Sequence, residues 1–256
     1  MPVVIFVEFQ ARYGGELADH LPMARVALHR MGAAPSRIAA FERQYVDGKK
    51  LQPLADAPAE ERARDAICAE IGRDGRDAVV RRYLAELMPG VGAGAFHPLI
   101  RLAYALEAGD DREIAAAFAY WRDAYLDLGV DAEETSLPFA PGIAFARLRR
   151  ELAGVALPKG LIFNGMSGAA ADPRFTAALR AGGSPRAERD VRTIAHAVVR
   201  WFAATRGFMA LHAMTATHAF RIVQPHLDVA TALPALWRAL CAAYSAAGLV
   251  EIADPG

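Results

Sequence analysis

Histidine is the residue type in this chain with the greatest potential for chemistry. Neutral imidazole is the most common metal ligand in proteins, and it also serves as a general acid or base near neutral pH. The chain contains no HExxH motif, and no two histidines are four residues apart. A metal site would therefore combine histidines from distant helices, as in helical bundles. The 256 residues include seven histidines: His20, His29, His97, His196, His212, His218 and His226.

Two of these histidines come just before a proline that opens a predicted helix. His20 precedes Leu21-Pro22, and His97 precedes Pro98. Proline is favoured in the first helical turn because its missing N–H would be unpaired there in any case. We therefore expect both imidazoles at helix N-termini.

Three further histidines belong to a predicted pair of helices over residues 190–205 and 208–223. At about 100° per residue, His212 and His218 fall at opposite edges of one apolar stripe, so both are predicted to point inward. They are six residues apart, about 9 Å along the axis, which is too far for one shared metal. His196, on the preceding helix, lies at about the level of His218.

Each inward histidine has a simpler interpretation as a core residue that donates to a carbonyl. Burying several imidazoles costs free energy unless each is hydrogen-bonded or bound to metal, so both interpretations stay open. Arg101 and Tyr104 share a helix face with His97. Two interpretations are open: both side chains line a pocket, or Arg101 is exposed and Tyr104 lies in the core.

Other motifs carry less information. Residues 90–94 read GVGAG, which lacks the third glycine of a dinucleotide fingerprint, and we expect a flexible lead into the next helix. Residues 165–168 do not form a GxSxG nucleophile elbow. Cys68 and Cys241 are too few for a disulfide framework and are expected to be reduced thiols.

Prolines and glycines mark the ends of helix-length segments along the chain, which predicts an all-α fold. We expect a helical bundle with Gly/Pro-rich loops that forms a single domain over residues 1–256. Strand signal is confined to residues 3–9, a run that fits a buried helix equally well, and residues 137–170 are expected to be loop with short helices. The expected helices cover about residues 22–30, 36–45, two helices within 59–87, 98–108, 111–128, 190–205, 208–223 and 233–247.

The charge balance limits the classes of partner. Lys and Arg number 29, as do Asp and Glu, so the formal net charge is zero. A neutral chain is not expected to bind nucleic acid or an anionic membrane. The apolar run at residues 2–7 lacks the features of a signal peptide, and no stretch approaches the roughly 20 apolar residues of a membrane helix. We expect a cytoplasmic protein that binds a small molecule, alone or as a homodimer.

Three segments, in this order, resemble the questin oxidase-like family, and the similarity extends over about residues 13–225. They are Ala18-Asp19-His20-Leu21-Pro22-Met23, Ala95-Phe96-His97-Pro98-Leu99-Ile100-Arg101, and Phe208-Met209-Ala210-Leu211-His212-Ala213-Met214-Thr215. The intervening region at residues 120–125, YWRDAY, fits as well.

The resemblance implies an oxidoreductase, an oxygenase of Baeyer–Villiger or ring-cleaving type that acts on an aromatic polyketide-like or other small apolar substrate with NADPH. At least one relative uses non-haem iron held by histidines and a carboxylated lysine. Carried over, His20, His97 and His212 become the ligands of Fe(II), and His196 and His218 compete to be a fourth. The catalytic candidates that handle protons or position substrate are His218, Tyr104 and Arg101.

Some positions depart from the family pattern. Asp19 stands where the family tends to have Asn, and it could orient a ligand from the second shell. Lys159 lies in a loop-like stretch and is not a secure counterpart of the modified lysine. Two alternatives follow: a metal-independent, NADPH-linked oxidase whose histidines act as acid–base groups, or a non-catalytic helical small-molecule-binding protein.

Overall fold

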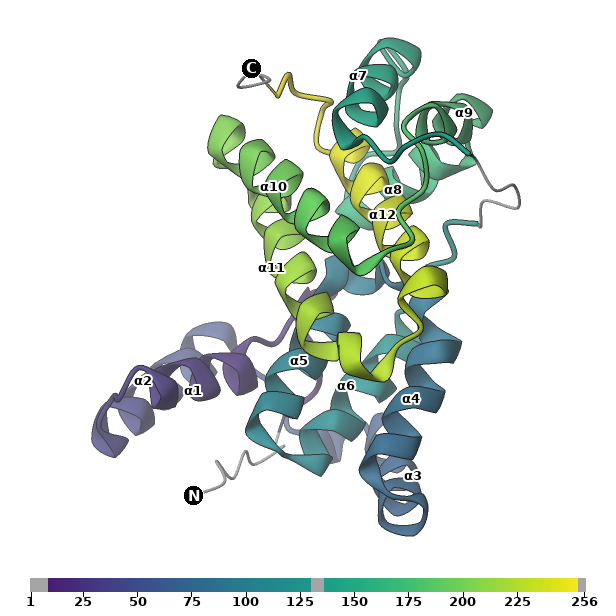
Figure 1. The fold of residues 1–256 in the computed structure, drawn as a ribbon. Helices are drawn as coiled ribbons and strands as arrows, with labels where there is room; N and C mark the ends of the chain where they lie inside the picture. The colour runs from purple at the N-terminus through teal and green to yellow at the C-terminus, as the bar shows by residue number, and fades with distance from the viewer. Residues whose placement is uncertain (1–8, 130–135, 253–256) are drawn as a thin grey trace. The chain divides into compact units, whose positions relative to one another are not determined.

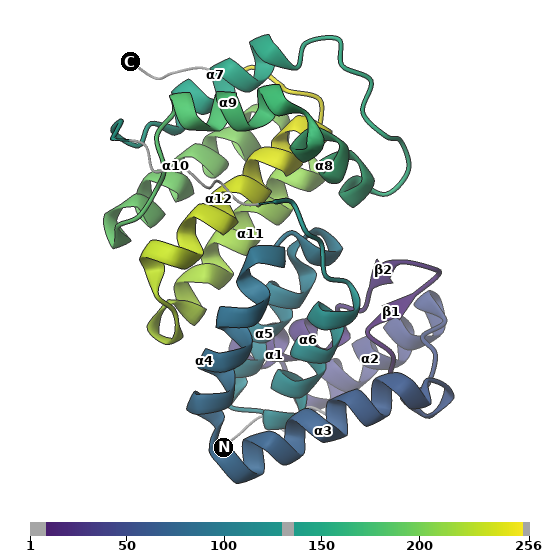
Figure 2. The same cartoon turned by 90° about the vertical axis from the view of Figure 1, so that its right-hand side faces the viewer.

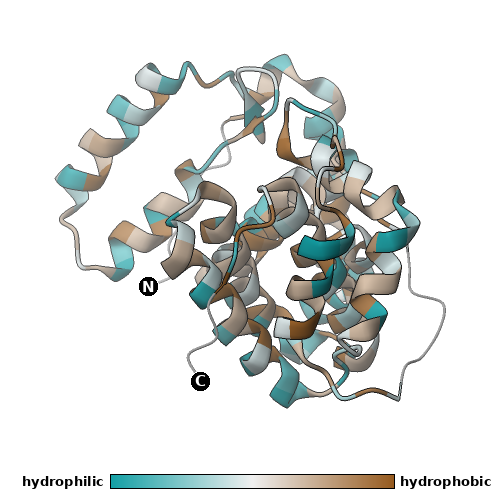
Figure 3. Ribbon diagram, turned by 90° about the horizontal axis from the view of Figure 1, so that it is seen from above, coloured by the Kyte–Doolittle hydropathy of each residue, from teal (hydrophilic) through white to brown (hydrophobic). Residues whose placement is uncertain are grey.

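The fold is all-α, as predicted. In a computed structural model that describes residues 9–129 and 136–252, twelve α-helices and one two-stranded hairpin occur (Figure 1). Hydrophilic and hydrophobic residues alternate along individual helices (Figure 3), as expected where one helix face is buried. The chain divides into two compact units: unit 1 comprises residues 1–83 and 97–124, and unit 2 comprises residues 84–96 and 125–256. A single domain over residues 1–256 stays a prediction.

Unit 1 combines the hairpin with the first six helices (Figure 2). Helix α5 packs against α6, and α3 also packs against α6. The turn between α5 and α6 needs glycine, because Gly109 has a φ of +70°. Its elements are β1 (Arg12–Tyr13), β2 (Leu17–Ala18), α1 (Leu21–Arg30), α2 (Pro35–Lys49), α3 (Pro58–Asp74), the first part of α4 (Arg76–Leu87), α5 (His97–Ala108) and α6 (Asp111–Asp123).

Unit 2 is built around α12 (Val229–Ala246), which packs against α7, α8, α10 and α11. Leu236, Leu240 and Tyr244 are completely buried, and the neighbouring alanines allow close approach of the surrounding helices. The other helices are α7 (Pro141–Glu151), α8 (Ile162–Ala171), α9 (Pro173–Ala181), α10 (Glu188–Thr205) and α11 (Phe208–Val223).

The predicted pairing of the helices around residue 206 is confirmed. Helices α10 and α11 lie side by side (Figure 1) and are joined by Arg206 and Gly207. Arg206 adopts a left-handed conformation with a φ of +47°, which ends α10 and reverses the chain.

Several predicted boundaries are wrong. The second helix is longer than expected (Pro35–Lys49), and α9 was not expected as a separate helix. Helix α6 ends at Asp123 rather than near residue 128, and Tyr125 packs so closely on Gly90 that a Cβ there would lie 2.4 Å from the ring. The GVGAG segment is therefore packed and largely buried, not flexible.

Two further expectations concern the chain start and membranes. The predicted strand at residues 3–9 lies outside the described residues except for Phe9, which forms an isolated bridge with Pro53. Within the described part of the chain, no helix combines the length and the apolar character needed to cross a membrane.

Candidate metal centre

The backbone fixes the orientation of His20. The residue follows the β1–β2 hairpin and directly precedes α1, whose second residue is Pro22. Its Nδ1 lies 2.8 Å from the carbonyl oxygen of Ala18. Because a carbonyl oxygen only accepts, Nδ1 carries the proton and Nε2 presents a lone pair. This tautomer is the one that a metal bound at Nε2 requires.

His97 begins α5 at the end of a strained turn. The preceding residues, Ala95 and Phe96, have φ angles of +55° and +71°, which non-glycine residues rarely adopt. Such strain persists only where the surrounding structure imposes it, and it is concentrated at functional sites. The His97 side chain is buried, so its ring is held in place by packing.

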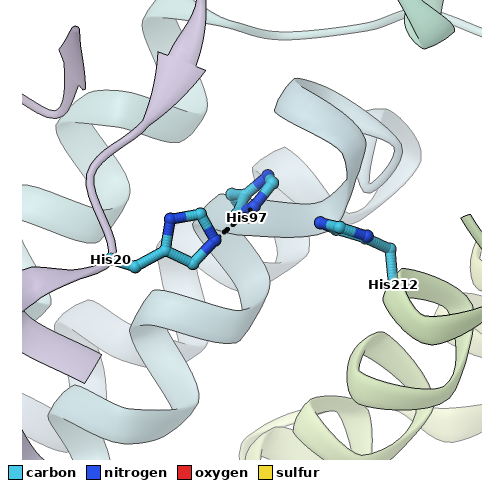
Figure 4. Close-up of side chains that lie close together, drawn as sticks. All are labelled: His20, His97 and His212. Atoms are coloured by element: carbon cyan, nitrogen blue, oxygen red, sulfur yellow. Dashed lines mark hydrogen bonds between the residues drawn. The ribbon is translucent and has the colours of Figure 1, made fainter. Parts of the chain in front are cut away.

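The rings of His20 and His97 meet through their Nε2 atoms, which are 3.0 Å apart (Figure 4). The ring planes are nearly perpendicular, at 88°. Two nitrogens bound to one metal at about 2.1 Å lie about 3.0 Å apart when the angle is 90°, and about 3.4 Å apart when it is tetrahedral. The pair therefore has the spacing of adjacent ligands on an octahedral ion. It also has the spacing of a hydrogen bond from His97 to His20.

The surroundings of His20 favour its neutral form. Although the residue is exposed, protein atoms around the ring lower its pKa. The hydrogen bond to Ala18 opposes this effect, and the positive charges of Lys49 and Arg101 lower the pKa further. A neutral imidazole at physiological pH is the form that binds metal, so the donor chemistry of this pair fits a metal ion such as iron or zinc.

Asp19 does not orient a histidine ring through the hydrogen bond it makes. Its carboxylate accepts from the backbone N–H of Leu21, the first residue of α1, at 2.8 Å. The side chain is buried, and this burial raises the pKa of Asp19 while the charge of Arg101 lowers it. Asp19 thus positions the helix start that follows His20, and the carbonyl of Ala18 orients the imidazole.

Arg101 is neither an exposed arginine nor a residue of an open pocket. Its side chain is only 2% exposed, and it donates two hydrogen bonds to the Glu113 carboxylate, from Nε at 2.9 Å and from Nη2 at 3.1 Å. This ion pair joins α5, which begins with His97, to α6. Tyr104 is half-buried on α5.

His212 lies in unit 2, on α11, and has the same tautomer as His20. Its Nδ1 is 2.7 Å from the carbonyl oxygen of Phe208, so Nδ1 donates and Nε2 keeps its lone pair. The side chain is buried and packs against the Phe208 ring, with ring centroids 4.1 Å apart. Figure 4 shows it projecting from α11.

The prediction that His218 points inward is wrong. His218 is exposed, and so is His196 on α10. The buried face of α11 is centred on small residues such as Ala213 and Ala216, whereas the apolar Phe208 is 69% exposed. His218 lies about 120° around the helix from His212. His218 is therefore too far around α11 to share a metal with His212, whereas His196 as a fourth ligand stays a prediction, and Lys159 is exposed between α7 and α8.

Three groups around the histidine pair were not predicted from the sequence. The carbonyl of Ala18 orients His20, the hydroxyl of Tyr45 accepts the His20 backbone N–H at 3.1 Å, and Glu113 pairs with Arg101. Backbone carbonyls have no sequence signal. Tyr45 and Glu113 belong to other helices, so local spacing does not reveal these contacts.

Searches of protein-family models, of curated proteins and of solved structures found no match to this chain.

Proposed function

We propose that this chain is a metal-dependent oxidoreductase in which His20, His97 and His212 hold one non-haem iron(II). The observation that carries the proposal is the His20–His97 pair, with its Nε2 atoms 3.0 Å apart. The choice of iron, and of an oxygenase acting on an aromatic polyketide-like substrate, comes from the resemblance to the questin oxidase-like family.

Two observations within unit 2 support His212 as the third ligand. Its Nδ1 donates to a backbone carbonyl, as in His20, so Nε2 is the ring nitrogen without a proton. The 3₁₀ turn at Ala93–Phe96 also packs against α11, the helix that carries His212. The turn contains Ala95 and Phe96, the two residues with positive φ angles that come before His97.

Three imidazoles would leave open coordination positions at iron(II) for dioxygen and an enolisable or phenolic substrate. The residues of this chain hold the ligand nitrogens in place. The carbonyls of Ala18 and Phe208 fix two tautomers. Arg101 acts as a positioning residue, because its ion pair with Glu113 joins α5 to α6. Tyr104 stays our candidate for moving a proton or positioning substrate, whereas the exposed His218 is no longer one.

Metal content tests the proposal. Protein purified without oxygen and reconstituted with Fe(II) should bind about one ion per chain. Changing His20, His97 or His212 to Ala should each weaken binding by about 100-fold or more, because a ligand is lost. The exposed histidines His29 and His218 provide matched controls, and their change to Ala should leave binding unaltered. Stoichiometry that stays near zero after reconstitution would refute the metal site.

Oxygen uptake tests the reaction. The Fe(II)-loaded protein should consume dioxygen with anthrone as an enolisable probe, and the His97→Ala variant should not. Uptake that requires NADPH but is unaffected by chelator and iron would favour the metal-independent oxidase instead. If His97→Ala loses folding stability, and the wild type binds neither metal nor probe, the histidines are structural. The use of NADPH, a cytoplasmic location and a homodimer stay predictions.

A further inference from the structure

Unit 2 contains a cavity that the proposed metal site does not use. It has a volume of about 670 Å³ and lies between the start of α7, the middle of α10, the end of α12 and residues 251–252. This volume is within the range of about 300–1,000 Å³ that is typical of small-molecule sites. All of its lining residues belong to unit 2, and none is a proposed metal ligand.

One part of the cavity wall is aromatic and rigid. It includes Phe139, Phe145 and Tyr244. The rings of Phe145 and Tyr244 pack with centroids 4.4 Å apart, and Phe139 and Phe145 both contact Trp237, at 5.3 and 5.4 Å. The Tyr244 hydroxyl donates to the carbonyl of Val250 at 2.5 Å, which holds the chain end that borders the cavity. Fixed rings of this kind favour a flat aromatic ligand.

The rest of the wall supplies positive charge. Arg149 and Arg200 line the cavity, and Glu251 is the one acid among its described lining residues. An Nη atom of Arg149 lies 3.3 Å from the Glu251 carboxylate, whose side chain is 75% exposed. Such an exposed ion pair contributes little free energy, so a ligand carboxylate could replace Glu251 at small cost. Guanidinium groups bind carboxylates through two parallel hydrogen bonds.

We propose that this cavity binds an aromatic monocarboxylate. The aromatic body would pack against Phe139, Phe145 and Tyr244, and the carboxylate would pair with Arg149 and Arg200. Glu251 occupies the place of that carboxylate in the free protein. The site is independent of the histidines and of any metal.

The test is calorimetric titration of the full chain with 2-naphthoate in the presence of chelator, with 2-naphthalenemethanol as the uncharged comparison. Naphthoate should bind at least about tenfold more tightly than the alcohol, because the alcohol lacks the charge-assisted hydrogen bonds. Equal binding of the two compounds, or no binding of naphthoate at millimolar concentration, would overturn the proposal.

Arginine variants test which side chains bind the ligand carboxylate. Arg149→Met and Arg200→Met should each weaken naphthoate binding by about tenfold. The matched controls are Arg147→Met on α7 and Arg192→Met on α10, which lie on the same helices but do not line the cavity, and which should bind as the wild type does. A loss of the same size in the controls would show only a general effect of charge and would contradict the assignment.

Two further variants test occupancy without removing an arginine. Glu251→Gln should tighten naphthoate binding several-fold, because it removes the competing carboxylate. Gly142→Trp should abolish binding by filling the cavity, since a Cβ at Gly142 would meet no atom within 4 Å. Circular dichroism checks that this variant is folded. A folded Gly142→Trp protein that binds normally, or a Glu251→Gln protein that binds more weakly, would contradict the site.

Discussion

The interiors of the two units are stabilised in different ways. In unit 1, Asp19, Arg64, Arg101 and Glu113 are all at most 3% exposed. In unit 2, the only buried charged side chain among the described residues is Arg238. Its Nε donates to the carbonyl of Leu128 at 2.6 Å, and its guanidinium lies over the Phe175 ring. The buried arginines of unit 1 therefore pair with carboxylates, whereas unit 2 buries one charged side chain, whose contacts with described residues include a backbone carbonyl and an aromatic ring.

This difference indicates where each unit is sensitive to substitution. Buried ion pairs add little net stability, because desolvation offsets their attraction, but removing one partner leaves a costly unpaired charge. Unit 1 keeps such a pair, Arg101–Glu113, whose arginine lies on the helix that begins with His97. Unit 2 depends on close packing of apolar side chains around α12. Electrostatic changes should therefore affect unit 1 most, and changes of volume should affect unit 2 most.

The largest effect is expected from breaking the Arg101–Glu113 pair. Glu113→Leu should lower the free energy of unfolding by about 3–5 kcal/mol, because the Arg101 charge stays buried without its partner. Urea denaturation at pH 7 measures this change. The double variant Arg101→Met/Glu113→Leu should recover most of the loss. A double variant as unstable as the single one would show that packing, rather than charge, dominates here.

The next largest effect is expected from a substitution that creates an empty space in the core of unit 2. Leu240 on α12 is completely buried, and Leu240→Ala should cost about 2–4 kcal/mol in unfolding free energy. Leu240→Met, which nearly conserves volume, should cost less than about 1.5 kcal/mol. Equal losses from both substitutions would contradict the emphasis on packing in this unit.

A tyrosine in unit 1 should make stability depend on alkaline pH. Burial raises the pKa of Tyr120 to about 12, above the ordinary value of about 10. The raised pKa contributes fully to the free energy of unfolding below pH 10. This contribution is lost as pH rises toward 12, because the tyrosine loses its hydroxyl proton at a lower pH in the unfolded chain than in the folded one. Tyr120→Phe should reduce the loss of unfolding free energy between pH 9 and 11.5 by up to about 2 kcal/mol. An unchanged pH profile would show that Tyr120 ionises normally.

The smallest effect is expected from an exposed ion pair in the same unit. Arg12 pairs with Asp123, whose side chain is 62% exposed. Asp123→Asn should change the unfolding free energy by less than about 1 kcal/mol, because solvent screens the pair. A loss comparable to that of Glu113→Leu would remove the distinction between buried and exposed pairs on which the comparison depends.

Much of the fold could be predicted from the sequence, because proline and glycine mark the helix ends. Pro22 and Pro98 correctly placed His20 and His97 near helix starts. The prediction for His218 is wrong because α11 is apolar on both faces: Phe208 and Leu211 are exposed, while the middle of the core side consists of small residues such as Ala213 and Ala216. The meeting of His20 with His97, which are 77 residues apart, depends on tertiary packing that periodicity does not encode.

Anomalous diffraction from crystals grown with Fe(II) under anaerobic conditions tests the central claim most directly. We predict one iron peak at about 2.0–2.2 Å from the Nε2 atoms of His20 and His97, and at a similar distance from Nε2 of His212. A map without a peak there, in which His97 simply donates a hydrogen bond to His20, would contradict the metal centre and the oxidoreductase function proposed from it.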